Sequence, residues 1–145
     1  MYSLRSYVNR SGPIDSFPGK NMAKKFTVLY VDDEQDNLLA FRSVFRRYFN
    51  VFTASGGSEA LDLLKDQAVH LVLSDQRMPN MTGIELLDYV NTQYPSIVKM
   101  IVTGYSEMEP ILTAVEQGRV AQYITKPWKV EELKSILEDA LHTSH

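Results

Sequence analysis

Residues 26–34 read FTVLYVDDE and decide the fold of this 145-residue chain. The run 26–31 is apolar or β-branched throughout and too short for a helix, which is typical of a strand buried on both faces. Asp32 and Asp33 follow it directly, and residues 35–48 then place apolar side chains at helical spacing. The stretch therefore predicts a strand that leads into a helix, with two carboxylates at the junction.

The same alternation of strand and helix recurs along the rest of the chain. Further strands are predicted at 50–54, 70–74, 97–102 and 120–124, and helices at 35–48, from 58 onward, at 83–92, 107–117 and 130–141. Ser58 is expected to cap the second helix and Gly118 to end the fourth. Five such units predict an α/β fold, a doubly wound five-stranded parallel sheet with five helices on its two faces.

Polar residues end the other strands as well. Asp75 follows the third strand, Thr103 the fourth and Lys126 the fifth. Two strand orders are common for such sheets. We predict the flavodoxin-like order 2-1-3-4-5, in which the first and third strands are neighbours and Asp75 would lie beside Asp32 and Asp33. Three carboxylates in one crevice repel unless a cation neutralises them, and oxygen ligands beside a phosphate favour Mg²⁺. The sequence predicts a site for a divalent metal and a phosphoryl group.

The composition fits one globular domain, with 44% hydrophobic and 23% charged residues. Residues 1–25 are polar and basic and are interpreted as an N-terminal extension, followed by a domain at 26–142 and a tail at 143–145. No apolar run approaches the roughly 20 residues that span a bilayer, and the first segment lacks the apolar centre of a signal peptide. We therefore expect a cytoplasmic location and no membrane partner.

Several kinds of chemistry are disfavoured. The chain has no cysteine, which excludes disulfides and thiolate catalysis. Its formal net charge of −3 argues against direct nucleic-acid binding, which requires a basic face. His70 is expected at the opposite end of its strand from the acidic residues, with His142 and His145 in the tail, so zinc is not expected at the site.

Four motifs at the predicted strand ends carry a resemblance to a known family. They are VDDE at 31–34, SDQRMPNMTG at 74–83, VTGYS at 102–106 and YITKPW at 123–128. In this order they resemble the response-regulator receiver domains, the phosphorylatable partners of sensor histidine kinases in two-component signalling, over about residues 26–142. The forms DQRMPxMTG, TGYSExEPI and TKPW also resemble a subgroup of receivers that are fused to cyclic-di-GMP phosphodiesterase domains or to hydrogenase-type transcriptional regulators.

The resemblance implies a role for each acidic residue. Asp75 would accept the phosphoryl group as an acyl phosphate, so the protein would be both nucleophile and substrate, with no separate turnover of a small molecule. Asp33, Asp75 and the backbone carbonyl of Arg77 would bind Mg²⁺ directly, and Asp32 through water. Lys126 would place its ammonium on a phosphoryl oxygen.

The resemblance also implies a switch and its partners. Thr103 would donate its hydroxyl to the phosphoryl group, helped by the backbone N–H of Gly104, and Tyr123 would rotate into the space that Thr103 leaves. The output face would be formed by the fourth helix, fifth strand and fifth helix, and Trp128 is a candidate contact for a partner. A histidine kinase or histidine phosphotransfer protein would supply the phosphoryl group, and a phosphorylation-dependent homodimer or output partner would follow.

Two bulky side chains are expected beside the site, and one apolar stripe away from it. Arg77 and Tyr105 stand two residues after the predicted acceptor and switch residues, where they would overhang the site and slow hydrolysis, unless Arg77 pairs with acidic neighbours. The apolar residues of the fourth helix, Ile111, Leu112 and Val115, are expected in the core rather than at an interface.

Alternative interpretations remain at the level of sequence. Asp32, Asp33 and Glu34 could simply cap the following helix. An aspartate-nucleophile phosphatase of the haloacid dehalogenase type also joins aspartate chemistry to Mg²⁺, but it needs a DxD pattern after the first strand, and this chain has DDEQ at 32–35. A pure interaction module that no longer accepts phosphate is a third possibility. The sequence also leaves open whether this is a single-domain regulator or a receiver from a longer protein.

Overall fold

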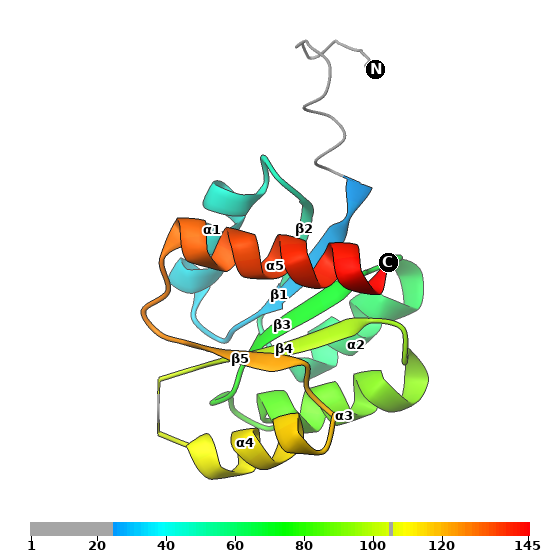
Figure 1. Cartoon of the computed structure of the whole chain (residues 1–145), viewed down its shortest axis with the longest axis vertical. Coiled ribbons are helices and arrows are strands. Elements are labelled where there is room, and N and C mark those ends of the chain that lie inside the picture. Colours follow the sequence, from blue (N-terminus) through cyan, green and yellow to red (C-terminus); the bar gives the residue numbers. More distant parts are fainter. Residues whose placement is uncertain (1–24, 105) are drawn as a thin grey trace, which may run out of the picture.

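A computed structural model describes residues 25–104 and 106–145, which form five strands and five helices in strict alternation (Figure 1). The strands are β1 (Thr27–Val31), β2 (Asn50–Ala54), β3 (Leu71–Asp75), β4 (Val98–Thr103) and β5 (Gln122–Thr125). The helices are α1 (Gln35–Phe45), α2 (Gly57–Asp66), α3 (Gly83–Gln93), α4 (Met108–Glu116) and α5 (Val130–Ser144).

The strands form one parallel sheet in the order β2-β1-β3-β4-β5. The predicted flavodoxin-like fold and its strand order are therefore confirmed. β1 and β3 are neighbours, and Val31 is in register with Ser74, so the residues that follow β1 lie beside the last residue of β3. All five strands end at the same edge of the sheet, which we call the carboxyl edge.

The helices form a layer on each face of the sheet, and each layer has its own apolar core (Figure 1). Successive residues of β1 alternate between the two cores. Leu29 and Val31 pack with α2, α3 and α4, whereas Val28 and Tyr30 pack with α1 and α5. This alternation follows from the two-residue period of a strand. A strand covered on both faces explains the nearly continuous apolar runs in the sequence.

Some helix ends differ from prediction. Ser58 does not cap α2, because the extended residue Gly56 precedes the helix and Ser58 lies inside its first turn. The cap of α3 was not predicted: the Thr82 hydroxyl accepts from the backbone N–H of Glu85, and the Glu85 carboxylate accepts from that of Thr82. Gly118 follows α4 with a φ of 77°, as expected of a glycine that ends a helix.

The C-terminal helix is longer than predicted. α5 continues to Ser144, so the predicted tail is mostly helical, and His142 lies in this helix with its ring edge on Phe26. His145 contacts the carbonyl of His70 at 3.1 Å, beside the amino end of β3. The predicted N-terminal extension lies outside the described residues except for Lys25. Within the described part of the chain, no helix is both long and apolar enough to cross a bilayer.

Gly83 allows the first turn of α3 to lie against the end of β3. A Cβ atom at this position would collide with the carbonyl oxygen of Asp75 and would stand 2.7 Å from Cδ1 of Ile101. The backbone cannot yield without moving the carboxyl edge. We expect Gly83→Ala to lower the free energy of unfolding by about 1–3 kcal/mol, as overpacking does. Urea denaturation measures this change.

Gly56→Ala is the matched control, because no atom lies within 4 Å of a Cβ built at Gly56. Replacing this residue before α2 should cost less than about 1 kcal/mol, mainly through helix capping. Equal losses in the two variants would contradict the steric explanation at Gly83.

Candidate functional site

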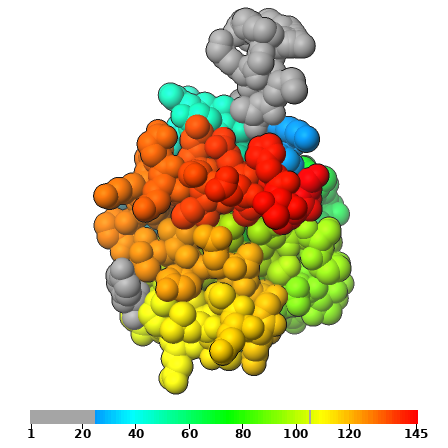
Figure 2. Space-filling model, in the orientation of Figure 1, coloured from blue at the N-terminus to red at the C-terminus, as the bar shows by residue number. Residues whose placement is uncertain are grey.

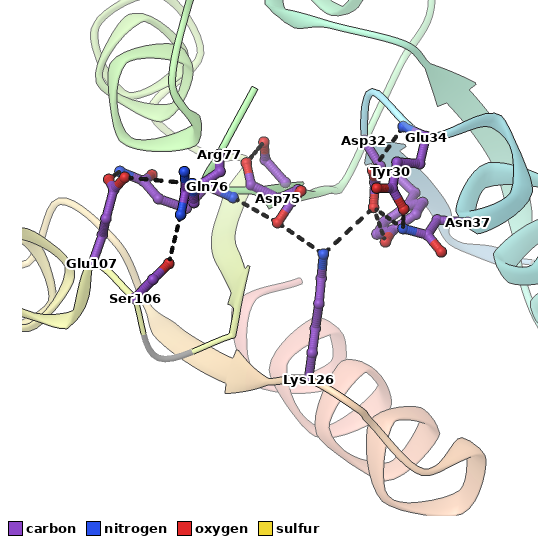
Figure 3. Close-up of polar contacts among 11 residues, drawn as sticks. Tyr30, Asp32, Glu34, Asn37, Asp75, Gln76, Arg77, Ser106, Glu107 and Lys126 are labelled. Atoms are coloured by element: carbon purple, nitrogen blue, oxygen red, sulfur yellow. Dashed lines mark hydrogen bonds and ion pairs between the residues drawn. The ribbon is translucent and has the colours of Figure 1, made fainter. Parts of the chain in front are cut away.

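The predicted site residues meet at the carboxyl edge of the sheet (Figure 3). Asp32 directly follows β1, Asp75 is the last residue of β3 and Thr103 is the last residue of β4. Lys126 directly follows β5, and its backbone N–H donates to the carbonyl of Thr103 at 2.8 Å. Four strands that are far apart in the sequence thus bring these side chains to one place.

Asp32 is fully buried and held by three donors. Its Oδ1 accepts from the backbone N–H of Glu34 at 3.0 Å. Its Oδ2 accepts from the hydroxyl of Tyr30 at 2.8 Å and from Nδ2 of Asn37 at 3.0 Å. Because a buried carboxylate is costly without such partners, these bonds explain how Asp32 is tolerated and why it has one orientation.

Asp75 is buried next to a lysine. Its Oδ1 lies 3.1 Å from Nζ of Lys126 and accepts from the backbone N–H of Gln76 at 3.0 Å. Nζ of Lys126 is also 3.9 Å from Oδ2 of Asp32, so the ammonium stands between the two carboxylates (Figure 3). Burial raises the pKa of Asp75, and the hydrogen bond and charge of Lys126 oppose that effect.

Asp33 completes an acidic group. One carboxylate oxygen each of Asp32, Asp33 and Asp75 lies within 4.8 Å of the others, and only Asp33 is exposed to solvent. Three carboxylates with this spacing offer the oxygen ligands that a hard divalent cation prefers. Among the described residues this is the only group of three or more acidic or histidine side chains with such spacing.

The acidic group opens into a cavity of about 280 Å³. The cavity is lined by residues from all four strand ends: Asp33, Glu34, Asp75, Gln76, Arg77, Thr103, Gly104, Ser106 and Lys126. One wall is acidic, and the others carry an ammonium, a hydroxyl and a guanidinium. Such a lining suits an anionic group that is held next to a cation.

The predicted switch residues lie on neighbouring strands. Thr103 is buried at 2% exposure, and Tyr123 in β5 is half-buried and packs against the core that α2, α3 and α4 cover. Their placement fits the predicted coupling, whereas the rotation of Tyr123 stays a prediction. Tyr105 lies outside the described residues.

Arg77 pairs with an acidic neighbour, which was one of the two expected alternatives. Its Nε lies 3.8 Å from Oε2 of Glu107, and its Nη1 donates to the hydroxyl of Ser106 at 3.4 Å. The guanidinium therefore connects the loop after β3 to the loop before α4 (Figure 3), and Arg77 and Ser106 both line the cavity.

The burial of two apolar residues, Leu112 and Trp128, bears on their predicted roles. Leu112 was expected in the core and is 49% exposed, because the buried stripe of α4 contains Ile111 and Ala114 instead. Trp128 is half-buried, with its ring centroid 5.7 Å from that of Phe45. Part of the indole thus belongs to the core, and its role as a partner contact stays a prediction.

Four residues that hold the site together were not singled out from the sequence. Tyr30 and Asn37 bind Asp32, and Gln76 and Glu107 lie beside the acceptor loop. Tyr30 carried a signal, since a tyrosine in a strand buried on both faces needs a partner for its hydroxyl. Asn37, Gln76 and Glu107 carried none, because their partners depend on how a loop folds back on the first turn of a helix or meets another loop.

Comparisons with known proteins agree with this geometry. The family model described as the response regulator receiver domain matches residues 28–138. The hydrogenase transcriptional regulatory protein HoxA of Cupriavidus necator is 40% identical over 118 residues, which are 81% of this chain and 24% of that protein. The transcriptional regulatory protein ZraR of Escherichia coli K12 is 34% identical over 119 residues, 81% of this chain and 27% of that protein.

Solved structures support the same assignment. The signal receiver domain of an HD domain-containing protein from Pseudomonas fluorescens is 30% identical with a TM-score of 0.79, covering 84% of this chain and 98% of that domain. The chain spans about a quarter of the length of the curated regulators that it matches. The expected resemblance to receivers of hydrogenase-type regulators is confirmed by HoxA. The chain belongs to the response-regulator receiver domains of two-component systems.

Proposed function

We propose that this receiver accepts a phosphoryl group on Asp75 from a phosphohistidine of a sensor histidine kinase or histidine phosphotransfer protein, in the cytoplasm. The observation that carries the proposal is the position of Asp75: its Oδ1 is 3.1 Å from Nζ of Lys126, in a cavity shared with Asp33 and Thr103. A nucleophile, a cation and a hydroxyl donor therefore face one small volume.

The transfer is a displacement at phosphorus. A carboxylate oxygen of Asp75 forms a bond to phosphorus while the phosphorus–nitrogen bond of the donor histidine breaks, which gives an acyl phosphate. Lys126 then pairs with a phosphoryl oxygen, and the hydroxyl of Thr103 donates to another, assisted by the N–H of Gly104. Thr103 moves toward the phosphoryl group, and Tyr123 turns inward.

The carboxylates of Asp33 and Asp75, with the backbone carbonyl of Arg77, would hold Mg²⁺, and Asp32 would contact it through water. Bound there, Mg²⁺ would neutralise the charge that develops on the phosphoryl oxygens. The donor set supports this assignment, because three carboxylate oxygens lie within 4.8 Å of one another and the side chain of Asp33 is exposed to incoming ions.

The alternative of a haloacid dehalogenase-type phosphatase is less well supported. Its nucleophile would be Asp32, the first aspartate after β1. That carboxylate is fully buried and already accepts three hydrogen bonds, so it is poorly placed to attack a substrate. Asp75, and not Asp32, lines the cavity.

The output surface would be the face formed by α4, β5 and α5, which Figure 2 shows as one continuous side of the molecule. Leu112 on α4 and Val130 at the start of α5 are both exposed apolar residues. Phosphorylation would promote homodimerisation or the docking of an output partner there. The transcriptional role in the names of HoxA and ZraR belongs to those longer proteins.

Intact mass after incubation with acetyl phosphate and Mg²⁺ tests the proposal. We expect an adduct of one phosphoryl group on the wild type and none on Asp75→Asn, because the amide is not a nucleophile. Asp88→Asn is the matched control, since Asp88 is a partly exposed carboxylate on α3, and it should be phosphorylated normally. Steady turnover of added phosphate esters would favour the phosphatase, and no reaction would favour an interaction module.

The position of Arg77 predicts an effect on the lifetime of the acyl phosphate. We expect Arg77→Ala to change the rate of autodephosphorylation severalfold without abolishing phosphorylation, because Arg77 lines the same cavity as Asp75 and its side chain could obstruct the attacking water. Arg47→Ala, an exposed arginine in the turn before β2, is the control. Decay of the phosphorylated form at the wild-type rate in Arg77→Ala would remove this role.

Sedimentation velocity with and without beryllofluoride and Mg²⁺ tests dimerisation. We expect the activated wild type to dimerise and Leu112→Asp to remain monomeric, because the charge would be buried in the interface. Leu39→Asp is the control, since Leu39 is also exposed, at 61%, but lies on α1. An unchanged monomer profile for activated wild type would exclude the dimer.

A further inference from the structure

Gln76 is a buried residue whose backbone and side-chain polar groups all make hydrogen bonds. It follows Asp75 directly and is only 3% exposed. Burying an amide without partners costs several kcal/mol, so its contacts identify what its side chain does. Each of those contacts leads to a different element around the phosphorylation site.

The backbone of Gln76 fixes the acceptor. Its N–H donates to Oδ1 of Asp75 at 3.0 Å and to the carbonyl of Val102 at 3.2 Å, and its carbonyl accepts from the N–H of Gly83 at 3.0 Å. These bonds hold the acceptor carboxylate, β4 and the start of α3 together. Any residue with a backbone N–H could make them, so they do not explain why the side chain is glutamine.

The side chain has two distinct ends with two distinct partners. Its Oε1 accepts from the backbone N–H of Ile84 at 2.9 Å, and because that partner is a donor, the orientation of the amide is determined. Its Nε2 is consequently directed to Oε1 of Glu107 at 3.3 Å. Gln76 thus satisfies an N–H in the first turn of α3. It also donates to Glu107, the residue directly before α4 (Figure 3).

Glu107 pairs with both residues that follow Asp75, namely Gln76 and Arg77. Its Oε1 accepts from Gln76, and its Oε2 lies 3.8 Å from Nε of Arg77. It precedes α4 as the N-cap residue and makes no side-chain capping bond to that helix. The Arg77 pair is largely exposed and contributes little, whereas the bond to Gln76 is part-buried and more strongly directional.

We propose that Gln76 is a positioning residue that couples the state of Asp75 to the first turn of α4 through Glu107. This inference rests on the proposed phosphorylation of Asp75. When the carboxylate becomes an acyl phosphate, the carboxylate charge that the Gln76 N–H faces is lost. The weakened hydrogen bond shifts the backbone of Gln76, and the side chain of Gln76 passes this shift to Glu107. This route does not involve Thr103 or Tyr123.

A purely structural role for Gln76 would consist of capping α3 alone. Gln76→Glu distinguishes the two roles, because the carboxylate can still accept from the N–H of Ile84 but faces Glu107 with an acceptor instead of a donor. Adding Glu107→Gln supplies a donor from the other side. The double variant restores a hydrogen bond of reversed direction, whereas a structural role predicts no such rescue.

The experiment measures amide hydrogen exchange of α4 in the full chain, with and without beryllofluoride and Mg²⁺. We expect the wild type to change its exchange rate in α4 severalfold on activation, Gln76→Glu to lose most of that change, and Gln76→Glu with Glu107→Gln to recover it to within about twofold of wild type. A full response in Gln76→Glu, or no recovery in the double variant, would overturn the inference.

Intact mass after acetyl phosphate, measured on the same samples, separates this inference from the proposed function. Phosphorylation of every variant with an α4 response that is independent of Gln76 would contradict only the coupling. No phosphorylation of the wild type would contradict both. If Gln76→Glu fails to fold, Glu107→Ala serves instead, because it removes the acceptor of Gln76 without altering a buried side chain. A wild-type α4 response in Glu107→Ala would then exclude the coupling.

Discussion

Parallel pairing of all five strands is the constraint on which the rest of the molecule depends. Because every strand runs in the same direction, every strand ends at the same edge, and the chain returns each time through a helix on one face. The residues after β1, β3, β4 and β5 therefore meet although they are distant in sequence. An antiparallel sheet with the same residues would distribute Asp32, Asp75, Thr103 and Lys126 over two opposite edges.

Electrostatic repulsion between the clustered carboxylates is the main cost of this arrangement. Two of the three are buried, and each depends on donors that come from other elements. Lys126 neutralises both Asp32 and Asp75 in part, while the hydroxyl of Tyr30 and the amide of Asn37 bind Asp32. The fold requires this balance, because uncompensated buried charge would destabilise it.

The sequence predicted what depends on local pattern. Strand runs buried on both faces, helical spacing and the order of polar strand ends were enough for the fold, the strand order and the members of the site. Helix boundaries were less accurate: Ser58 is predicted to cap α2 because serine is a frequent cap, whereas Gly56 is the extended residue before the helix and Ser58 lies within the first turn. The exposure of Leu112 was also missed, since only the packing of α4 decides which of its apolar residues face the sheet. The links among Gln76, Arg77 and Glu107 depend on the distance between two loops, which no local pattern encodes.

The bond between Tyr30 and Asp32 has a consequence for how the core and the site evolve. The ring of Tyr30 stacks on Phe41 at 4.4 Å between centroids, inside the layer that α1 and α5 cover, while its hydroxyl holds the buried carboxylate. One side chain is thus a core residue at its ring and a donor that orients Asp32 at its hydroxyl. A substitution at Phe41 that shifts the Tyr30 ring would therefore also shift the donor that orients Asp32, so the packing of α1 and the geometry of the acidic group are mechanically linked.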